Sequence, residues 1–277
     1  MRLGLSCVLK HDSPEEWAER TRALGLRACK FPLDHRAPLQ KIDEYVRACR
    51  EADIVIAEVG AWKNLFAPDP AVRAENYAYV LRQLELAEYV GAECVVNISG
   101  ACGEVWDGGY PGNYTRETFD RIVETVRKLL DEAKVKKTTY TLEPMPWMLP
   151  WDGESYLELI RAVGDPRFAV HMDAVNLMNS PDRYFHCAEF LEHTFGLLHG
   201  LIKSTHVKDV QLQRTLTLHL KEVPIGEGGF DVAAYMRLTE AEGPDSPVLL
   251  EHLADEAIYL KALATLKTIL DREGIRY

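Results

Sequence analysis

Residues 94–98 read CVVNI, residues 115–133 read TRETFDRIVETVRKLLDEA, and residues 138–143 read TTYTLE. The first and third segments are short β-branched or apolar runs, which are typical of strands. The middle segment repeats apolar residues such as Phe119, Ile122 and Val126 at helical spacing, which is typical of a helix lying on a sheet. Together the three segments predict a strand–helix–strand unit with parallel strands.

The same alternation of short apolar runs and amphipathic stretches continues in both directions along the chain. We predict eight strands, at Leu3–Val8, Ala28–Phe31, Ile54–Val59, Cys94–Ile98, Thr138–Glu143, Phe168–Asp173, Ile202–Val207 and Val248–Glu251. Helical segments lie between them, and a closing helix is expected over Ala257–Asp271. This number of units in a chain of 277 residues predicts a (β/α)₈ TIM barrel.

An open, doubly wound sheet is the competing architecture for such an alternation. Its phosphate-binding signature, G-x-G-x-x-G directly after the first strand, is absent, because the residues after Val8 read LKHD. The barrel is therefore favoured. No linker or low-complexity segment interrupts the chain, so we predict one domain over residues 1–277.

Charge and composition argue against several classes of protein. Lys and Arg number 32 against 43 Asp and Glu, and the resulting formal charge of −11 would repel a nucleic-acid backbone. No apolar stretch reaches the roughly 18 residues of a membrane-spanning helix, and Leu3–Leu9 lacks a signal-peptide cleavage pattern. The six cysteines are scattered without a C-x-x-C pair, as in a reduced protein. We expect a cytoplasmic protein that binds neither nucleic acid nor membranes.

Four consecutive predicted strands end in side chains that can bind a metal ion. They are Glu143, Asp173, His206 and Glu251. The carboxyl ends of barrel strands surround one mouth, where the catalytic groups of this fold lie. An apolar residue precedes both Glu143 and Glu251, and side chains alternate along a strand, so both acids are able to face the barrel axis.

Three carboxylates at one mouth would repel one another unless a cation neutralised them. Three oxygen donors and one imidazole favour Mn²⁺, with Mg²⁺, Co²⁺ or Zn²⁺ as alternatives. The competing interpretation is four unrelated polar residues held by surface hydrogen bonds. Their position on consecutive strands favours the metal site.

Several short motifs surround these residues. They are TLEP at 141–144, HMDAVN at 171–176, HVKD at 206–209, PIGEGGFD at 224–231 and LLEH at 249–252. Together they resemble the xylose-isomerase-like TIM-barrel family of sugar phosphate isomerases and epimerases, over nearly the whole chain. The most similar branches are the ketose 3-epimerases, hydroxypyruvate isomerases and inosose-processing enzymes.

This resemblance implies that Glu143, Asp173, His206 and Glu251 bind one divalent metal, usually manganese. It also implies that Glu143 and Glu251 form the pair that transfers the proton. Two features depart from the family pattern. Asn176 stands where many members have a histidine that contacts substrate, and no arginine follows His206 closely. The exact reaction and the sugar are therefore left open.

The expected activity is a metal-dependent isomerisation or epimerisation of a sugar or small polyhydroxy carbonyl compound. The proton next to the carbonyl is removed by a carboxylate, and a metal stabilises the resulting enediolate. A dehydratase acting on a keto sugar would begin with the same step. A hydrolase similar to the AP endonucleases is less favoured, because the third and fourth strands end without histidine and the chain is acidic. A barrel that binds without catalysis is the fourth alternative.

Other polar and aromatic residues at the predicted mouth are expected to contact the substrate. They are Lys208, Asn176, Trp62, Asn97 and Trp147, with Asn64 and Trp151 in the same loops. We expect His171 to be a buried core residue and His252 to point away from the site. The turn at 226–229 is interpreted as a tight turn rather than a phosphate site. The expected partner is a small molecule, and a homo-oligomer is left open.

Overall fold

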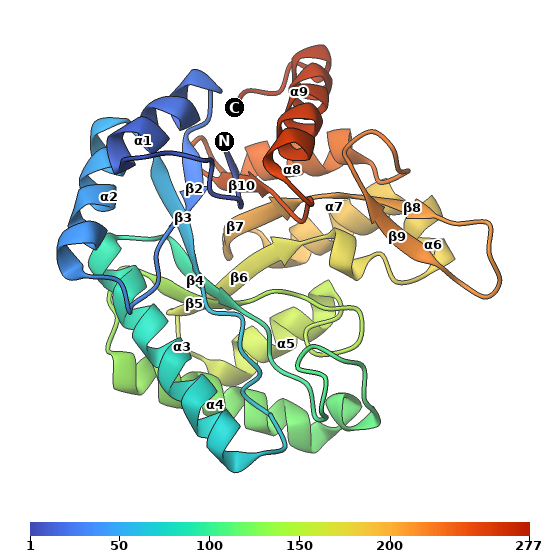
Figure 1. Ribbon diagram of the computed structural model, residues 1–277. Helices are drawn as coiled ribbons and strands as arrows, with labels where there is room; N and C mark the ends of the chain where they lie inside the picture. The colour runs from blue at the N-terminus through green and yellow to red at the C-terminus, as the bar shows by residue number, and fades with distance from the viewer.

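A computed structural model describes residues 1–277, and in it eight parallel strands close into a barrel surrounded by helices (Figure 1). Around the barrel the strands follow the order β1-β10-β7-β6-β5-β4-β3-β2. Their bounds are β1 Arg2–Leu5, β2 Ala28–Lys30, β3 Val55–Gly60, β4 Cys94–Asn97, β5 Thr139–Leu142, β6 Phe168–Asp173, β7 Ile202–Val207 and β10 Pro247–Leu250. The predicted (β/α)₈ barrel is confirmed.

The helices begin and end largely where the sequence provides caps. They are α1 Pro14–Ala23, α2 Leu39–Glu51, α3 Pro70–Val90, α4 Arg116–Ala133, α5 Gly153–Val163, α6 Pro181–Phe185, α7 Cys187–Leu198, α8 Val232–Glu242 and α9 Glu256–Glu273, with 3₁₀ turns η1 Pro111–Tyr114 and η2 Val175–Leu177. The Ser13 side chain accepts a hydrogen bond from the Glu16 amide at the start of α1. At the end of α3, Gly91 adopts the left-handed conformation (φ 73°) that stops the helix.

The barrel closes where the first strand meets the last. Strand β1 pairs with β10, with Gly4 opposite Leu249. A side chain at Gly4 would lie 2.2 Å from the Ala28 carbonyl oxygen of β2 and 2.6 Å from the Leu249 side chain of β10, so only glycine fits at this position between the two neighbouring strands. No helix in the structure combines the length and apolar character that crossing a lipid bilayer requires.

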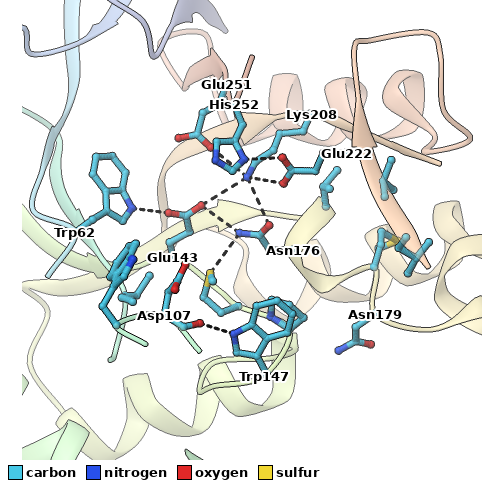
Figure 2. A pocket seen from close by; sticks show the side chains of 18 of the residues that line it. Trp62, Asp107, Glu143, Trp147, Asn176, Asn179, Lys208, Glu222, Glu251 and His252 are labelled. Carbon is cyan, nitrogen blue, oxygen red and sulfur yellow. Dashed lines mark hydrogen bonds and ion pairs between the residues drawn. The ribbon is translucent and has the colours of Figure 1, made fainter. Parts of the chain in front are cut away.

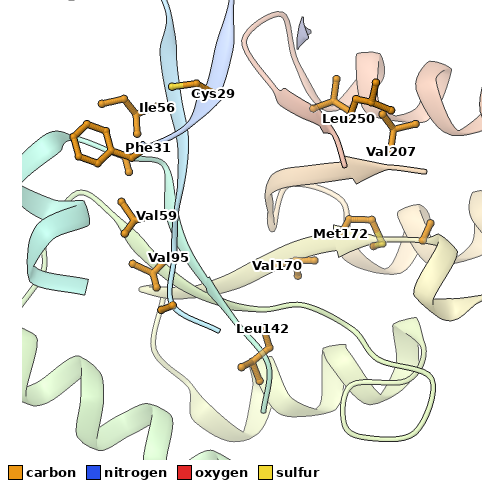
Figure 3. Close-up of a cluster of buried hydrophobic side chains, with 14 of the residues drawn as sticks. Cys29, Phe31, Ile56, Val59, Val95, Leu142, Val170, Met172, Val207 and Leu250 are labelled. Atoms are coloured by element: carbon orange, nitrogen blue, oxygen red, sulfur yellow. The ribbon is translucent and has the colours of Figure 1, made fainter. Parts of the chain in front are cut away.

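Side-chain alternation along the strands separates the hydrophobic core from the barrel interior. Leu142, Met172, Val207 and Leu250 belong to the core between strands and helices (Figure 3). Residues one position away along these strands therefore face the barrel axis. The register supports this arrangement, since Asp173 pairs with His206. This alternation carries polar groups from β5, β6, β7 and β10 to one end of the barrel.

One element was not expected from the sequence. After β7 the chain forms a two-stranded antiparallel hairpin, β8 Asp209–Leu212 and β9 Leu220–Val223, which projects from the barrel (Figure 1). The Asp209 carboxylate anchors its base by accepting hydrogen bonds from the amides of Val210, Gly226 and Gly228 at 2.8, 2.9 and 2.9 Å. The hairpin forms part of the wall of a cavity at the barrel mouth.

Candidate active site

The four predicted donors converge at the barrel mouth. One ligand atom from each of Glu143, Asp173, His206 and Glu251 lies within 4.8 Å of the others. The His206 Nδ1 atom is 3.0 Å from a Glu251 oxygen, 3.8 Å from Glu143 and 4.0 Å from Asp173. Each residue comes from the end of a different strand, so the closure of the barrel brings them together.

Two atoms of this cluster, His206 Nδ1 and Asp173 Oδ2, are fully buried and make no hydrogen bond of regular geometry. Their close neighbours are charged groups, since Nδ1 lies 3.0 Å from a Glu251 oxygen and Oδ2 lies 2.6 Å from the Lys208 ammonium. Three carboxylates and one imidazole are donors that oxygen-preferring divalent cations accept. The donor set therefore fits a divalent metal ion, and the cluster could hold one.

Lys208 places its ammonium group among the same carboxylates. Its Nζ lies 2.6 Å from Asp173, 3.2 Å from Glu251 and 3.9 Å from Glu143. Burial disfavours the charged lysine, but these carboxylates, Asp173 above all, outweigh burial and raise the Lys208 pKa well above its ordinary value. Lys208 therefore remains positively charged at neutral pH.

The three carboxylates are not equivalent. Burial raises the pKa of Asp173 to about 7, and Lys208 opposes this only in part. Burial also disfavours ionisation of Glu251, but His206 outweighs burial and lowers the pKa of Glu251 to about 2. For Glu143, His206 and Lys208 overcome burial and hold the pKa well below its usual range. The two glutamates are thus ionised at neutral pH, whereas Asp173 titrates in that range.

A second buried layer lies behind His206. Glu58, from β3, accepts a hydrogen bond from His206 Nε2, which lies 3.2 Å from each of its carboxylate oxygens. His171 is 3.7 Å from Glu58, and its ring centroid is 4.1 Å from that of His206. The Ser204 hydroxyl lies 2.6 Å from His171 Nδ1. The Glu58 contact directs His206 Nδ1 toward the cluster.

Sequence reasoning did not single out Glu58, although the signal is visible. Glu58 lies inside the otherwise apolar strand β3 and has no solvent exposure. A buried acid in such a run points to a partner inside the barrel. His171 was expected to be a buried, hydrogen-bonded core residue, and the structure places it so. Burial, together with the neighbouring His206, lowers the His171 pKa to about 4, so its ring is neutral.

The cluster opens into a cavity of about 980 Å³ (Figure 2). Trp62 Nε1 donates to a Glu143 oxygen at 2.6 Å, and Asn176 Nδ2 donates to the other oxygen at 3.2 Å. Lys208 and Trp147 also line the cavity. Four of the five predicted substrate contacts, Trp62, Trp147, Asn176 and Lys208, therefore lie in its wall.

Asn97 does not line this cavity. It is fully buried, its side-chain oxygen accepts a hydrogen bond from the Lys63 amide, and its side-chain nitrogen donates to the Tyr140 hydroxyl. Because these contacts occupy its amide group, Asn97 is not expected to contact the substrate. Asn64 similarly bonds the backbone of its own loop, and Trp151 stacks on Tyr114 with a centroid separation of 5.0 Å.

His252 lies in the cavity wall, and the expectation that it points away is wrong. Its backbone adopts a positive φ of 64°, which interrupts the alternation of the strand, so both Glu251 and His252 face the cavity. Its Nδ1 lies 2.5 Å from Glu222 on the hairpin strand β9. Glu222 also contacts Lys208 at 3.3 Å, and sequence reasoning missed it because the hairpin was not predicted.

In the turn at 226–229, the amides that face Asp209 are already hydrogen-bonded and cannot bind a phosphate. The amides of Gly226 and Gly228 both donate to the Asp209 carboxylate. A side chain at Gly228 would lie 2.2 Å from that carboxylate, so glycine is required there. This geometry is that of a tight turn anchored by an aspartate, as expected from the sequence.

Comparisons with known proteins place the chain among related barrels. None of the curated protein sequences compared with it matches. A magnesium complex of a xylose isomerase-like TIM barrel protein from Mycobacterium smegmatis has 16% identity and a TM-score of 0.67, covering 94% of this chain and 87% of that one. Ketose 3-epimerases are also among the matching structures.

Two further structures belong to proteins with a named activity. The 3-keto-D-glucoside 4-epimerase from E. coli has 16% identity and a TM-score of 0.68, covering 97% of this chain and 99% of that one. A probable 3-DHS dehydratase from Bacillus anthracis has 14% identity and a TM-score of 0.74, covering 98% and 100%. At these identities the likeness shows the fold alone.

The match to a family model identifies the family of the chain, which the structural likeness does not. The model described as xylose isomerase-like TIM barrel matches residues 18–269, which include all four residues of the candidate metal site. The chain belongs to the xylose isomerase-like TIM barrel family.

Proposed function

We propose that this protein is a divalent-metal-dependent isomerase or epimerase of a sugar or small polyhydroxy carbonyl compound. One observation carries the proposal: Glu143, Asp173, His206 and Glu251 bring ligand atoms within 4.8 Å of one another beside an open cavity. The family and its structural relatives, which include epimerases and a dehydratase, support an enzyme that processes sugars.

Glu143 and Glu251 are the proposed proton-transfer pair. Their low pKa values keep both carboxylates ionised, so each is able to accept a proton from a carbon next to a carbonyl. Trp62 and Asn176 hold the Glu143 carboxylate from both of its oxygens. Removal of a proton by one glutamate, followed by delivery of a different proton from the other glutamate on the opposite face of the substrate, gives epimerisation; the second glutamate must take up that proton from solvent before it delivers it. Return to the neighbouring carbon gives isomerisation.

The proposed metal ligands are Glu143, Asp173, His206 and Glu251. We favour Mn²⁺, with Mg²⁺, Co²⁺ and Zn²⁺ as alternatives. When bound, a divalent ion supplies charge stabilisation to the substrate oxygens as the proton leaves. Burial of His206 lowers its pKa, but Glu251 and Glu58 outweigh burial and raise it well above its ordinary value, so ion binding at Nδ1 requires loss of a proton there.

Lys208 and Asn176 are proposed to hold substrate oxygens. The Lys208 ammonium and the Asn176 amide oxygen lie 3.5 Å apart in the cavity wall. A charged lysine donates hydrogen bonds to hydroxyl or carbonyl oxygens, and Asn176 both donates and accepts. Asn176 cannot act as a base at neutral pH, so it positions substrate rather than moving protons.

A dehydratase is the second candidate function. The structure with the TM-score of 0.74 is a probable 3-DHS dehydratase, and dehydration begins with the same removal of a proton. The two reactions differ in the fate of the enediolate, because a dehydratase expels a hydroxyl group from it. A hydrolase similar to AP endonucleases is disfavoured, since β3 and β4 contribute Glu58 and Asn97 rather than histidines.

We infer that residues 1–277 act as one domain, because β1 near one end of the chain pairs with β10 near the other. A small-molecule substrate agrees with the sugar substrates named for the structural relatives. The cytoplasmic location and the absence of nucleic-acid binding stay predictions from the sequence. Whether the protein forms a homo-oligomer stays open.

Metal analysis followed by deuterium exchange tests the proposal. Purified protein is expected to contain or take up one divalent ion per chain. With that ion bound, it is expected to exchange deuterium from D₂O into at least one member of a panel of keto sugars. Loss of water from the substrate, with no returned proton, would favour the dehydratase. Bound metal without exchange into any keto sugar would contradict the isomerase.

A further inference from the structure

The cavity has two chemically different ends. The inner end carries the charged groups Glu143, Lys208 and Glu251. The outer end is aromatic, with Trp106, Tyr114 and Trp147 on the loops that follow β4 and β5. In Figure 2, Trp147 and Asp107 lie across the cavity from Glu251 and His252. A ligand that spans the cavity would therefore meet carboxylates at one end and aromatic faces at the other.

The Trp147 ring is held in place by the neighbouring loop. Its Nε1 donates to the Asp107 carbonyl at 2.6 Å, and Asn113 donates to the Trp147 carbonyl at 3.0 Å. The backbone at Gly109 lies against the ring, since a side chain there would be 3.3 Å from Trp147 Cβ and Cγ. The only polar atom of the indole is thus already bonded, yet the side chain is 41% exposed. Such a fixed ring offers a stacking surface at little entropic cost.

The charge at the outer end selects against an anionic ligand. Asp107 is the ionisable group beside the aromatic residues, and no arginine lines the cavity. The Lys208 ammonium contacts Asp173 and Glu251, and the Lys30 ammonium lies 5.4 Å from the ring centre of Trp62 at the inner end. A phosphate at the outer end would therefore meet an acid and neither lysine nor arginine. A neutral group with exposed C–H faces is favoured.

The size of the cavity points to more than one sugar ring. Its volume of about 980 Å³ lies near the upper end of the roughly 300–1,000 Å³ of small-molecule pockets. The reacting carbons must reach Glu143 and Glu251 at the inner end. The aromatic end is then free for a part of the substrate that does not react.

We propose that Trp106, Tyr114 and Trp147 form an outer subsite that binds a second sugar ring. The substrate is then an unphosphorylated keto sugar carrying a glycosyl unit. This proposal rests on the proposed function, because the inner end must hold the reacting keto sugar. The competing occupant of the same aromatic surface is a second copy of the chain.

Binding of matched sugars tests the subsite. Titration calorimetry compares D-fructose with its glucosyl derivatives turanose, maltulose and isomaltulose, using metal-loaded protein. One good ring contact corresponds to about tenfold in affinity. We expect at least one glucosyl-fructose to bind about tenfold more tightly than fructose. Trp147→Ala and Trp106→Ala are expected to reduce that ratio toward one, whereas Trp147→Phe retains most of it.

Tyr89→Ala is the matched control, because Tyr89 is an exposed aromatic residue on α3 outside the cavity. It is expected to keep the wild-type ratio. Trp106 donates no side-chain hydrogen bond in the structure, so Trp106→Ala remains informative if Trp147→Ala folds poorly. Equal affinities in the wild-type protein, no binding of any of the four sugars, or a ratio unaffected by both tryptophan variants would overturn the subsite.

Two parallel measurements separate the explanations. Sedimentation that shows a dimer converted to monomers by Trp106→Ala, with the binding ratio unchanged, would overturn the subsite and assign the surface to a second copy. Deuterium exchange into the bound sugars tests the proposed function separately. Deuterium exchange into the bound sugars, with equal affinities for fructose and the glucosyl-fructoses, would overturn only the subsite. Tighter binding of a glucosyl-fructose without deuterium exchange would support the subsite and contradict the isomerase.

Discussion

The chemistry of the candidate site depends on keeping two glutamates ionised in a buried setting. Glu143 and Glu251 retain low pKa values only because His206 and Lys208 lie among them. Trp62 and Asn176 then fix the orientation of Glu143. A neutral amide in place of Glu143 would keep the shape and one hydrogen-bond acceptor but remove the proposed base.

Glu143→Gln is therefore expected to abolish most of the activity while the fold remains. The loss in the rate of deuterium exchange into a responsive keto sugar is expected to be about 10²–10⁴-fold, the typical contribution of a general base. Glu104→Gln serves as the control, because Glu104 is an exposed glutamate on the loop after β4. Exchange at the wild-type rate in Glu143→Gln would exclude this residue as the base.

Glu58 acts on the site through His206 rather than through substrate. Its carboxylate accepts a hydrogen bond from His206 Nε2, and this contact leaves Nδ1 facing the three acids. Removing the partner of a metal-binding histidine typically costs 10–100-fold in metal affinity. We expect Glu58→Gln to weaken Mn²⁺ binding by about that factor in a competition titration against a chelator.

Two readouts distinguish this positioning role from a general loss of stability. The ¹⁵N spectrum of His206 in the metal-loaded protein should show the proton on Nε2 in the wild type and a changed signal in Glu58→Gln. Glu58→Asp should recover part of the affinity. The control Glu75→Gln alters an exposed residue on α3 and should bind metal as the wild type does. Unchanged affinity in Glu58→Gln would contradict the role.

A single site residue could be predicted from the sequence where its side chain follows the regular alternation along its strand. Asp173 and His206 were predictable because Asp173 ends β6, His206 lies one residue before the end of β7, and each is next to an apolar residue. His252 was not, since its positive φ turns the side chain from the expected face. Asn97 ends a strand at the mouth, but its amide is used by Lys63 and Tyr140. Pattern alone does not reveal such local partners.

At the scale of elements, the hairpin β8–β9 depends on a single buried acid at its base. Asp209 accepts hydrogen bonds from four amides, two of which lie in the 226–229 turn. Without that carboxylate the amides lose their partner and the hairpin loses its anchor. Since β9 carries Glu222 into the cavity wall, the anchor also positions a residue of the site.

Asp209→Ala is expected to make the hairpin tip more accessible to protease. Arg214 lies in the exposed tip, next to residues such as Leu216, which is 95% exposed. We expect trypsin to cleave after Arg214 several times faster in Asp209→Ala than in the wild type, as judged by the masses of the fragments. Asp209→Asn keeps one acceptor oxygen, so its cleavage rate should lie between those of the wild type and Asp209→Ala. Equal cleavage rates would show that the hairpin does not need this anchor.

The barrel elements were predictable because each combines a periodic apolar pattern with a local stop or cap. Gly91 ends α3, and Ser13 caps the start of α1. The hairpin lacked such a signal, because its strands DVQL and LKEV are short and partly exposed. Long-range hydrogen bonds to Asp209 specify it, and these cannot be inferred from neighbouring residues.

Helix α3 also fixes the start of β5 through one carboxylate. Glu88 accepts hydrogen bonds from the amides of Lys136, Lys137 and Thr138 at 3.0, 2.9 and 3.1 Å. Burial opposes ionisation of Glu88, but the hydrogen bonds from the three amides together outweigh it and lower the Glu88 pKa. A folded-state pKa below the unfolded value of about 4.3 adds stability that is fully present above that pH and is lost as the pH falls through the lower folded-state value.

Glu88→Gln is therefore expected to lower the free energy of unfolding by about 1 kcal/mol at pH 7, allowing for solvent screening. The difference from the wild type should shrink as the pH falls below about 4.3, because the unfolded wild-type chain then takes up a proton at Glu88 and the folded chain does so at a lower pH. Urea unfolding at several pH values measures this. A difference that stays constant down to pH 3 would mean that charge is not its source.

At the scale of the whole molecule, the barrel brings together the proposed metal ligands, which lie up to more than a hundred residues apart in sequence. Glu143 follows β5 and Glu251 follows β10, while Asp173 and His206 pair across β6 and β7. The unfolded chain cannot reproduce this arrangement, so a metal that binds the four residues binds the folded state alone. Its binding energy then adds to the stability of the entire barrel.

Adding metal to chelator-treated protein is expected to raise its melting temperature. An ion at 100 times its dissociation constant contributes about 2.7 kcal/mol, which corresponds to roughly 5–10 °C for a chain of this size. The shift should increase with the logarithm of the Mn²⁺ concentration and should be lost in Asp173→Asn and His206→Ala. Because the four ligands reach one ion only when β5, β6, β7 and β10 are all in place, unfolding should remain a single transition. No shift with Mn²⁺, Mg²⁺, Co²⁺ or Zn²⁺ would contradict the metal site, since a ligand that binds only the folded state must stabilise it.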